Sequence, residues 1–100
     1  MAKIANNSVT VSSSGTRVAF TTAPTPLKSI LIHANSGNSG NVYVGDSSVT
    51  TSNCPPIAAG KTLELKFRES ADETAGDLMD FYVDADTNGN GITYLVVQLS

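Results

Sequence analysis

The sequence predicts an all-β protein, a single-domain β-sandwich of the jelly-roll type with about seven or eight short antiparallel strands. Ser and Thr supply 23 of the 100 residues, and eight Asn and eight Gly leave few of the straight-chain residues that favour helices. Short runs rich in β-branched residues recur about every 8–15 residues, and Gly, Pro, Asn or Ser ends each run. The runs are not copies of one another, which argues against a solenoid or a propeller.

Length and composition predict one folded domain over residues 1–100, with residues 1–7 as a flexible N-terminal arm. Hydrophobic residues are 40% of the chain and charged residues 15%, which is typical of a domain with a core rather than of a disordered chain. The single cysteine cannot form an intramolecular disulfide, and one Cys with one His cannot form a zinc site. No apolar run reaches the length of a membrane span, and the start does not resemble a signal peptide. We therefore expect a soluble protein that is made in a cytoplasm and has no membrane partner.

The charge pattern argues against a nucleic-acid partner. The net charge is −3, and the six basic residues form no cluster that could neutralise phosphates. The three tyrosines and three phenylalanines are not interleaved with basic residues, as they are along a groove that binds single strands.

The first two predicted strands lie on either side of a short turn. Ser8–Ser12 and Thr16–Phe20 each place two large apolar residues on one face, and the turn Ser13–Gly15 between them predicts a hairpin. Ala23–Pro26 is a predicted linker, because its prolines cannot donate hydrogen bonds to a sheet.

The next segment predicts a central strand. Leu27–Ala34 contains Ile30–Ile32, which is apolar on both faces, so we expect a second sheet or another subunit to cover both sides. The turn-rich stretch Asn35–Asn41 then leads to a short strand at Val42–Gly45.

The second half of the chain contains the clearest alternating pattern. Residues 61–68 point Leu63, Leu65 and Phe67 to one side and polar residues to the other, which predicts a strand with one wet face. Residues 69–80 break this pattern and allow one helical turn, with Ser70 and Glu73 as a capping box.

Two further strands are predicted at residues 81–83 and 92–99. They flank residues 84–91, whose Asn-Gly steps favour a hairpin turn. The last strand is rich in apolar residues, as is Ile30–Ile32. The apolar residues of both segments can belong to the core or to a subunit interface. We expect the core to explain most of this apolar content and a subunit interface to explain part of it.

Residues 84–89 match the first half of an EF-hand loop. Asp84, Asp86 and Asn88 stand at the positions whose oxygens bind calcium, and Gly89 stands at the bend. The carboxylate expected at position 12 is replaced by Leu95, so we favour a hairpin loop whose Asp and Asn side chains cap their own backbone. Three further acidic residues keep a different type of calcium site open as an alternative: Glu73, Asp77 and Asp80.

No catalytic, cofactor-binding or metal-binding residue is predicted. Gly45–Ser48 is similar to the Gly-Asp-Ser start of some serine hydrolases, and His33 could complete a triad on paper. The chain is too short for those α/β folds and has no strand-to-helix turn, so we predict a turn in which Asp46 binds the following backbone amides. His33 is predicted to be an ordinary strand residue. Cys54 is predicted to be a small apolar loop residue rather than a reactive thiol.

Three segments carry a resemblance to a known family. Residues 38–49 (NSGNVYVGDSSV), 57–65 (IAAGKTLEL) and 81–89 (FYVDADTNG) resemble small structural proteins of tailed bacteriophages. The resemblance spans residues 28–99. It implies a β-sandwich or jelly-roll module that decorates or cements the head, often as a trimer on the outer surface of the capsid. The family supplies no catalytic residue, and its capsid-contacting residues do not map onto positions of this sequence.

The leading hypothesis is therefore a non-enzymatic virion protein on the capsid surface, with the major capsid protein or other virion proteins as partners. The symmetric trimer would multiply a weak contact into high avidity. The alternative is a carbohydrate-binding β-sandwich of a tail or fibre, assisted by calcium at the Asp84–Asn88 loop. That alternative needs aromatic platforms, and the chain has no Trp and only Tyr43, Tyr82 and Tyr94 to provide them. A hydrolase is a third hypothesis, which activity toward generic esters would test.

Overall fold

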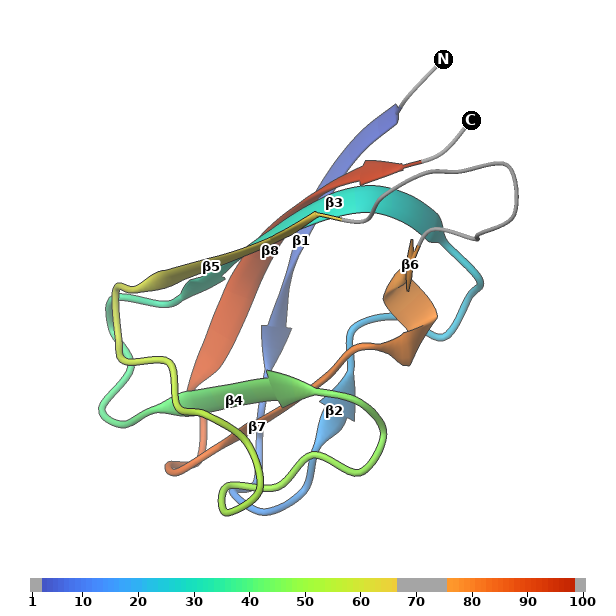
Figure 1. Cartoon of the computed structure of the whole chain (residues 1–100). Coiled ribbons are helices and arrows are strands. Elements are labelled where there is room, and N and C mark those ends of the chain that lie inside the picture. Colours follow the sequence, from blue (N-terminus) through green and yellow to red (C-terminus); the bar gives the residue numbers. More distant parts are fainter. Residues whose placement is uncertain (1–2, 67–75, 99–100) are drawn as a thin grey trace.

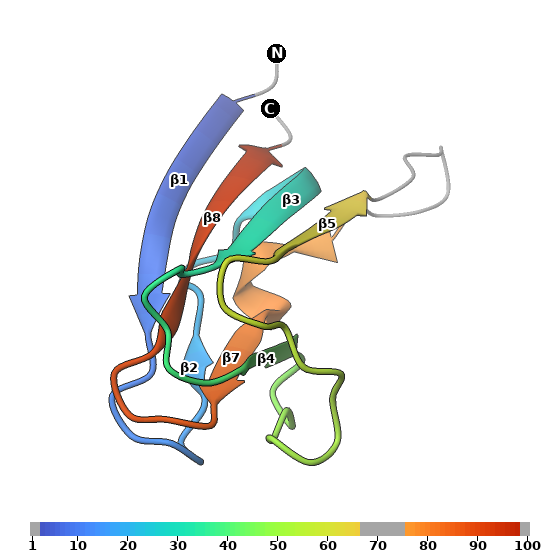
Figure 2. The same ribbon diagram turned by 90° about the vertical axis from the view of Figure 1, so that its left-hand side faces the viewer.

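A computed structural model describes residues 3–66 and 76–98, and it confirms a β-sandwich of two antiparallel sheets (Figure 1). The larger sheet has the strand order β1 (Lys3–Thr10), β8 (Gly91–Gln98), β3 (Pro26–Ala34) and β5 (Thr62–Lys66), and the short β6 (Gly76–Asp77) also pairs with β3. The smaller sheet has the order β2 (Val18–Ala19), β7 (Tyr82–Ala85) and β4 (Val42–Gly45). Figure 2 shows the four long strands of the larger sheet side by side above the smaller one.

The connections give the sandwich its jelly-roll character. From β1 to β4, and again from β7 to β8, each strand is followed by a strand of the opposite sheet. An isolated bridge between Val42 and Ile57 extends the smaller sheet beyond β4 before the chain crosses to β5. The predicted helical turn is a 3-10 turn at Leu78–Asp80, while the capping box predicted at Ser70 and Glu73 lies outside the described residues.

The predicted hairpin between residues 8 and 20 is wrong. β1 pairs with β8 in the larger sheet, whereas β2 pairs with β7 in the smaller one. The reason is Val11, which is fully buried, and whose backbone binds Asn90 and Gly89 instead of continuing toward β2. Burying Val11 between the sheets directs the chain across the sandwich.

The hairpin predicted around residues 84–91 is also wrong, for the same reason. β7 and β8 lie in different sheets, so the loop between them spans the end of the sandwich. The N-terminal arm is a third correction. Residues 3–7 form the first half of β1, and all eight residues of β1 pair with β8 in an unbroken register.

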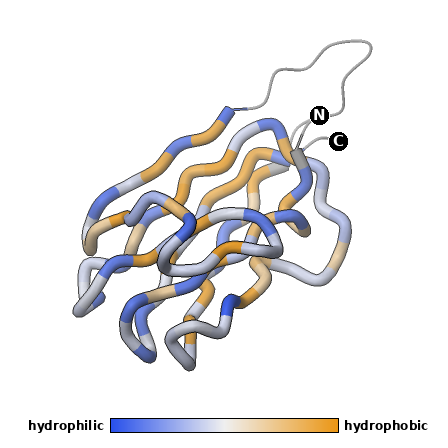
Figure 3. The backbone as a smooth tube through the Cα atoms, turned by 60° about the horizontal axis from the view of Figure 1, so that its bottom comes forward, coloured by the Kyte–Doolittle hydropathy of each residue, from blue (hydrophilic) through white to orange (hydrophobic). Residues whose placement is uncertain are grey.

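The hydrophobic core fills the space between the sheets. Its buried members come from both sheets and from the crossing segments: Val9, Val11, Phe20, Leu27, Ile30, Ile32, Ala34, Val42, Leu78, Val83, Ala85, Ile92, Tyr94 and Val96. Figure 3 shows hydrophobic stretches running through the strands, while the connecting loops are mostly hydrophilic. The alternation of each strand therefore assigns one face to this core and the other to the outside.

β3 occupies the central place that its apolar sequence predicts. It lies between β8 and β5, with Ile30 and Ile32 buried in the core. Leu31 points to the opposite face and is 38% exposed. The prediction of cover on both sides is thus met on the inner face only, and no described part of this chain covers the outer face at Leu31.

β5 has the predicted alternating pattern over the residues that the structure describes. Leu63 and Leu65 are half-buried, and Thr62, Glu64 and Lys66 are exposed. Phe67 and Arg68, which were expected to continue this strand, lie outside the described residues.

Candidate functional site

The outer face of the smaller sheet is the first candidate, because two loops fold against it. Val83 and Ala85 of β7 are fully buried in the core, so Tyr82 and Asp84 point outward. Tyr82 is flanked in register by Ala19 on β2 and by Gly45 on β4. These small neighbours leave space beside the Tyr82 ring.

Asp84 attaches the first loop to this face. Its side chain is only 1% exposed, and its carboxylate accepts hydrogen bonds from the backbone amides of Gly15 (3.0 Å) and Ala85 (2.8 Å). The Ser14 hydroxyl donates to the carbonyl of Ala85 at 2.8 Å, and the Ser14 amide donates to Asn88 at 2.7 Å. Residues 13–17 are therefore held close to the end of β7.

The remaining oxygens of the EF-hand-like segment also bind protein donors. Asp86 accepts from the Tyr43 hydroxyl at 3.1 and 3.2 Å and from the Asn41 amide at 3.3 Å. The side chains thus cap backbone amides, but in the described part of the chain the predicted capping of their own backbone occurs only between Asp84 and Ala85. The other amides, those of Ser14, Gly15, Ser39 and Asn41, belong to neighbouring loops. Within the described residues, no group of three or more His, Cys, Asp or Glu side chains could hold a metal ion.

The structure does not bring together the acidic residues that were considered for another type of calcium site. One oxygen of Asp77 accepts from the amides of Thr25 (2.8 Å) and Met79 (2.9 Å), where it caps the 3-10 turn. Asp80 is exposed, and Glu73 lies outside the described residues.

The second loop, residues 46–54, folds down onto β4 at Gly45. A side chain on Gly45 would lie 3.1 Å from Val49, which is buried against the strand. Asp46 accepts from the amide (2.9 Å) and hydroxyl (2.7 Å) of Ser48, and these bonds are the main cause that lowers the pKa of its carboxyl. The predicted Asp46 turn is therefore confirmed.

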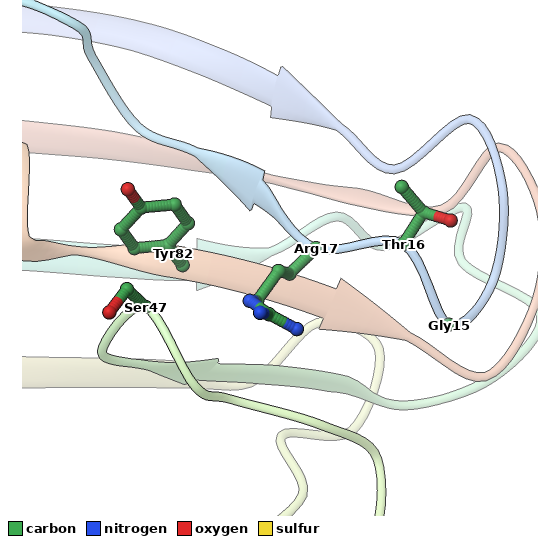
Figure 4. Close-up of a pocket in the computed structure, with 5 residues that line it drawn as sticks. All are labelled: Gly15, Thr16, Arg17, Ser47 and Tyr82. Atoms are coloured by element: carbon green, nitrogen blue, oxygen red, sulfur yellow. The ribbon is translucent and has the colours of Figure 1, made fainter.

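A shallow trough lies between the two loops. It has a volume of about 540 Å³ and is lined by Gly15, Thr16, Arg17, Ser47 and Tyr82. Figure 4 shows Arg17 and Tyr82 over the same stretch of β7, with Ser47 beside Tyr82 on the loop that follows β4. Its volume falls within the range of small-molecule sites. Sequence reasoning named Tyr82, together with Tyr43 and Tyr94, as a tyrosine that could lie at a surface, but it did not connect Tyr82 with Arg17.

The other two tyrosines do not offer an exposed platform. Tyr43 and Tyr94 are buried, and burial is the main cause that raises the pKa of each phenol. Tyr94 packs in the core against Phe20, with a ring-centroid distance of 5.3 Å. Tyr82 is therefore the tyrosine of this chain that is placed to contact a ligand.

The Gly-Asp-Ser segment and His33 are far apart in the fold. Ser47 lies on a loop over the outer face of the smaller sheet. His33 lies on the outer face of the larger sheet, where its ring nitrogen is 3.2 Å from the Thr62 hydroxyl. The two residues point away from opposite sides of the sandwich, so they do not form a nucleophile and base pair.

Cys54 is held against β4 beneath the second loop. Its Sγ donates to the carbonyl of Val44 at 3.1 Å, and burial raises the pKa of the thiol. We expect Cys54 in the folded protein to react with iodoacetamide at neutral pH roughly tenfold more slowly than in denaturant, because the thiolate is disfavoured and access is limited. Mass spectrometry of a labelling time course measures both rates. Equal rates would contradict this placement.

The outer face of the larger sheet is the second candidate. Ile4, Leu31, Leu95 and Val97 form a patch that we name the apolar strip. Leu31 pairs with Leu95, and Ile4 pairs with Val97, so the four side chains occupy adjacent strands of one face. Ile4 is 73% exposed, Leu95 41% and Leu31 38%.

No protein-family model and no curated protein matches the chain. In the part of the chain that the structure describes, no helix has the length and apolar character needed to cross a membrane. The interpretation of the two surfaces therefore rests on their own geometry and chemistry.

Proposed function

We propose that this protein is a non-enzymatic structural component of a bacteriophage virion that assembles as a symmetric trimer on the capsid surface and reinforces the shell. The observation that carries the proposal is the apolar strip, which the described part of the chain leaves uncovered. The phage context and the trimer come from the sequence resemblance.

The concentration of the exposed apolar residues favours an interface. Among the described residues, four large hydrophobic side chains are exposed, and three of them lie in the apolar strip. The fourth, Met79, lies on the 3-10 turn. Single exposed apolar residues are normal on protein surfaces, whereas a contiguous group on a regular sheet marks a surface that another protein covers.

The charges around the strip favour further copies of this chain as its cover. Glu64 and Lys66 are exposed on the same outer face along β5. A border that carries one acid and one base can pair with a symmetry-related copy of itself. Charged residues and prolines commonly prevent the edge strand of a sheet from pairing with another chain. At the opposite edge, residues 4–10 of β1 contain neither.

Binding of a trimer to the capsid shell would stabilise the shell. Three equal contacts with the major capsid protein act together, so a weak single contact becomes a strong one. Because a trimer bound only to the assembled shell stabilises that state, disassembly of the shell becomes more costly.

The mass in solution tests the assembly. Light scattering over a dilution series, with and without calcium, should give a constant trimer mass that does not depend on calcium. The trimer should also sediment with mature capsid shells of the phage that encodes it, and it should not hydrolyse generic esters. A monomer at micromolar concentration that does not bind shells would refute the proposal.

Two matched variants locate the interface. Leu31→Lys should convert the trimer to monomers, because removing the lysine ammonium from water at the interface is costly even with Glu64 in register beside it. Met79→Lys should keep the trimer, although Met79 is exposed to the same extent, 38%, as Leu31. Light scattering measures both masses, and circular dichroism verifies the fold. If both variants have the same mass, the apolar strip is not the interface.

A further inference from the structure

The trough on the smaller sheet contains three side chains with unused hydrogen-bonding capacity. Within residues 3–66 and 76–98, no hydrogen bond or ion pair involves the Arg17 guanidinium, the Ser47 hydroxyl or the Tyr82 hydroxyl. Arg17 does interact with Asp46 at longer range, where its charge helps to lower the pKa of that carboxyl. The three groups come from three separate segments and face one concavity (Figure 4).

Arg17 determines the charge of a suitable ligand. A guanidinium presents a planar fork of donors that matches the two oxygens of a carboxylate. Asp46 is an opposite charge that interacts with Arg17 at longer range, and its carboxylate is already bound to Ser48 at 2.7 and 2.9 Å. The fork of Arg17 therefore remains available to an acidic group that enters the trough.

Tyr82 and Ser47 determine what is attached to that carboxylate. A half-buried aromatic ring offers an apolar surface with a polar tip, which suits the C–H face and the hydroxyls of a sugar ring. The two hydroxyls on this side of the trough can each donate and accept a hydrogen bond. A simple aliphatic acid would use Arg17 but would leave the two hydroxyls bonded only to water.

The walls of the trough are held in place before any ligand binds. Gly15 is bonded to Asp84, and Ser14 is bonded to Ala85 and Asn88. On the opposite side, the Asn53 side chain accepts from the Thr50 amide at 2.8 Å and donates to the Ser48 carbonyl at 3.0 Å. Such preorganisation reduces the ordering cost of binding.

From this geometry we propose that the trough binds an acidic monosaccharide unit, such as a uronic acid. Arg17 binds the carboxylate, the Tyr82 ring contacts the sugar face, and Ser47 binds a ring hydroxyl. The trough lies on the outer face of the smaller sheet and the apolar strip on the outer face of the larger sheet. The two sheets form opposite layers of the sandwich (Figure 1). This inference therefore goes beyond the structural role, and an assembled trimer can expose the trough while the strip is covered.

An NMR titration of the full-length protein with glucuronate tests the proposal. Saturable amide shifts should be confined to residues 14–17, 46–48 and 82, with a dissociation constant in the millimolar range. Glucose has the ring without the acid, and acetate has the acid without the ring. Each should bind at least about tenfold more weakly. Acetate binding equal to that of glucuronate would overturn the sugar assignment in favour of a bare carboxylate, such as an acidic side chain of a partner protein.

Variants assign the roles within the trough. Arg17→Gln should weaken glucuronate binding by at least about tenfold, and Arg17→Lys should restore only part of it, because lysine keeps the charge but lacks the fork. Tyr82→Ala should weaken binding by about fivefold or more. Lys61→Gln removes the same charge at an exposed position just before β5 of the larger sheet and should leave binding unchanged.

Two outcomes would refute the site. The first is that glucuronate causes no saturable amide shifts. The second is that Arg17→Gln and Lys61→Gln weaken glucuronate binding equally. Both results are independent of trimer assembly. Leu31→Lys should lower the mass in solution and preserve glucuronate binding, whereas Arg17→Gln should keep the trimer mass and weaken glucuronate binding.

Discussion

Replacing Gly91 with alanine is expected to destabilise the protein by about 3 to 4 kcal/mol, at or just above the upper end of the usual range for overpacking. Gly91 begins β8 and pairs with Thr10 at the end of β1. A methyl group there would overlap the carbonyl oxygen of Val9. Because the obstacle is backbone rather than a flexible side chain, the two strands must separate to admit it.

Gly91 also holds the loop that follows β3, through hydrogen bonds of its backbone. The Gly91 amide donates to the side-chain oxygen of Asn38 at 3.0 Å, and the Gly91 carbonyl accepts from the Asn35 amide and the Asn38 side chain. Moving Gly91 therefore disturbs β1, β8 and the loop that follows β3. Thermal unfolding should show a fall in Tm of about 12 °C or more for a domain of this size.

Gly37→Ala is the matched control for Gly91. Gly37 lies in the loop after β3, and a methyl group on it would meet no atom within 4 Å. We expect its effect on the free energy of unfolding to stay within about 0.5 kcal/mol. Equal Tm values for the Gly91→Ala variant and the wild type would show that β1 and β8 do not approach as described.

Replacing Asp84 with alanine is expected to cost about 3 kcal/mol, because hydrogen bonds to a charged acceptor are strong and the Ala85 amide, which loses its acceptor, is buried. The substitution removes the partner of the Gly15 amide, which attaches residues 13–17 to the smaller sheet. The Asp84→Ala variant should therefore have both a lower Tm and weaker glucuronate binding, because Arg17 belongs to that loop.

Two variants separate the role of Asp84 from a general effect of charge. Asp84→Asn keeps an oxygen that can accept from Gly15, so it should cost about 1 kcal/mol. Asp80→Ala removes the same charge at an exposed position and should change the stability by less than about 0.5 kcal/mol. Chemical denaturation measures all three. An Asp80→Ala loss as large as that of Asp84→Ala would mean that net charge, and not the buried bonds, is responsible.

The two outer faces of the sandwich have different chemistry, and this difference organises the functional proposals. The larger sheet presents aliphatic side chains in register across three strands, which suits a protein interface. The smaller sheet presents a polar trough with one cation and one aromatic ring, which suits a small ligand. A surface protein of a particle can use one face for assembly and the other for contact with its surroundings.

Local patterns in the sequence were sufficient to predict the fold class and the positions of most strands. The strand at Val42–Gly45 has the predicted bounds, and the alternation in residues 62–66 assigns the predicted faces. The Asp46 turn also follows the prediction. Such features depend on neighbouring residues, because strand periodicity and the hydrogen bonds of Asp and Asn act over a few positions.

Only the tertiary structure decided which sheet each strand joins and which side chains meet. A turn between two strands has the same residues whether the chain folds back as a hairpin or crosses the sandwich, so residues 13–15 and 84–91 were misassigned to hairpins. Burial of Val11 between the sheets settles the first case. The trough was likewise hidden, because Arg17, Ser47 and Tyr82 are brought together by strand order. Long-range pairing determines that order, and no short stretch of sequence encodes it by itself.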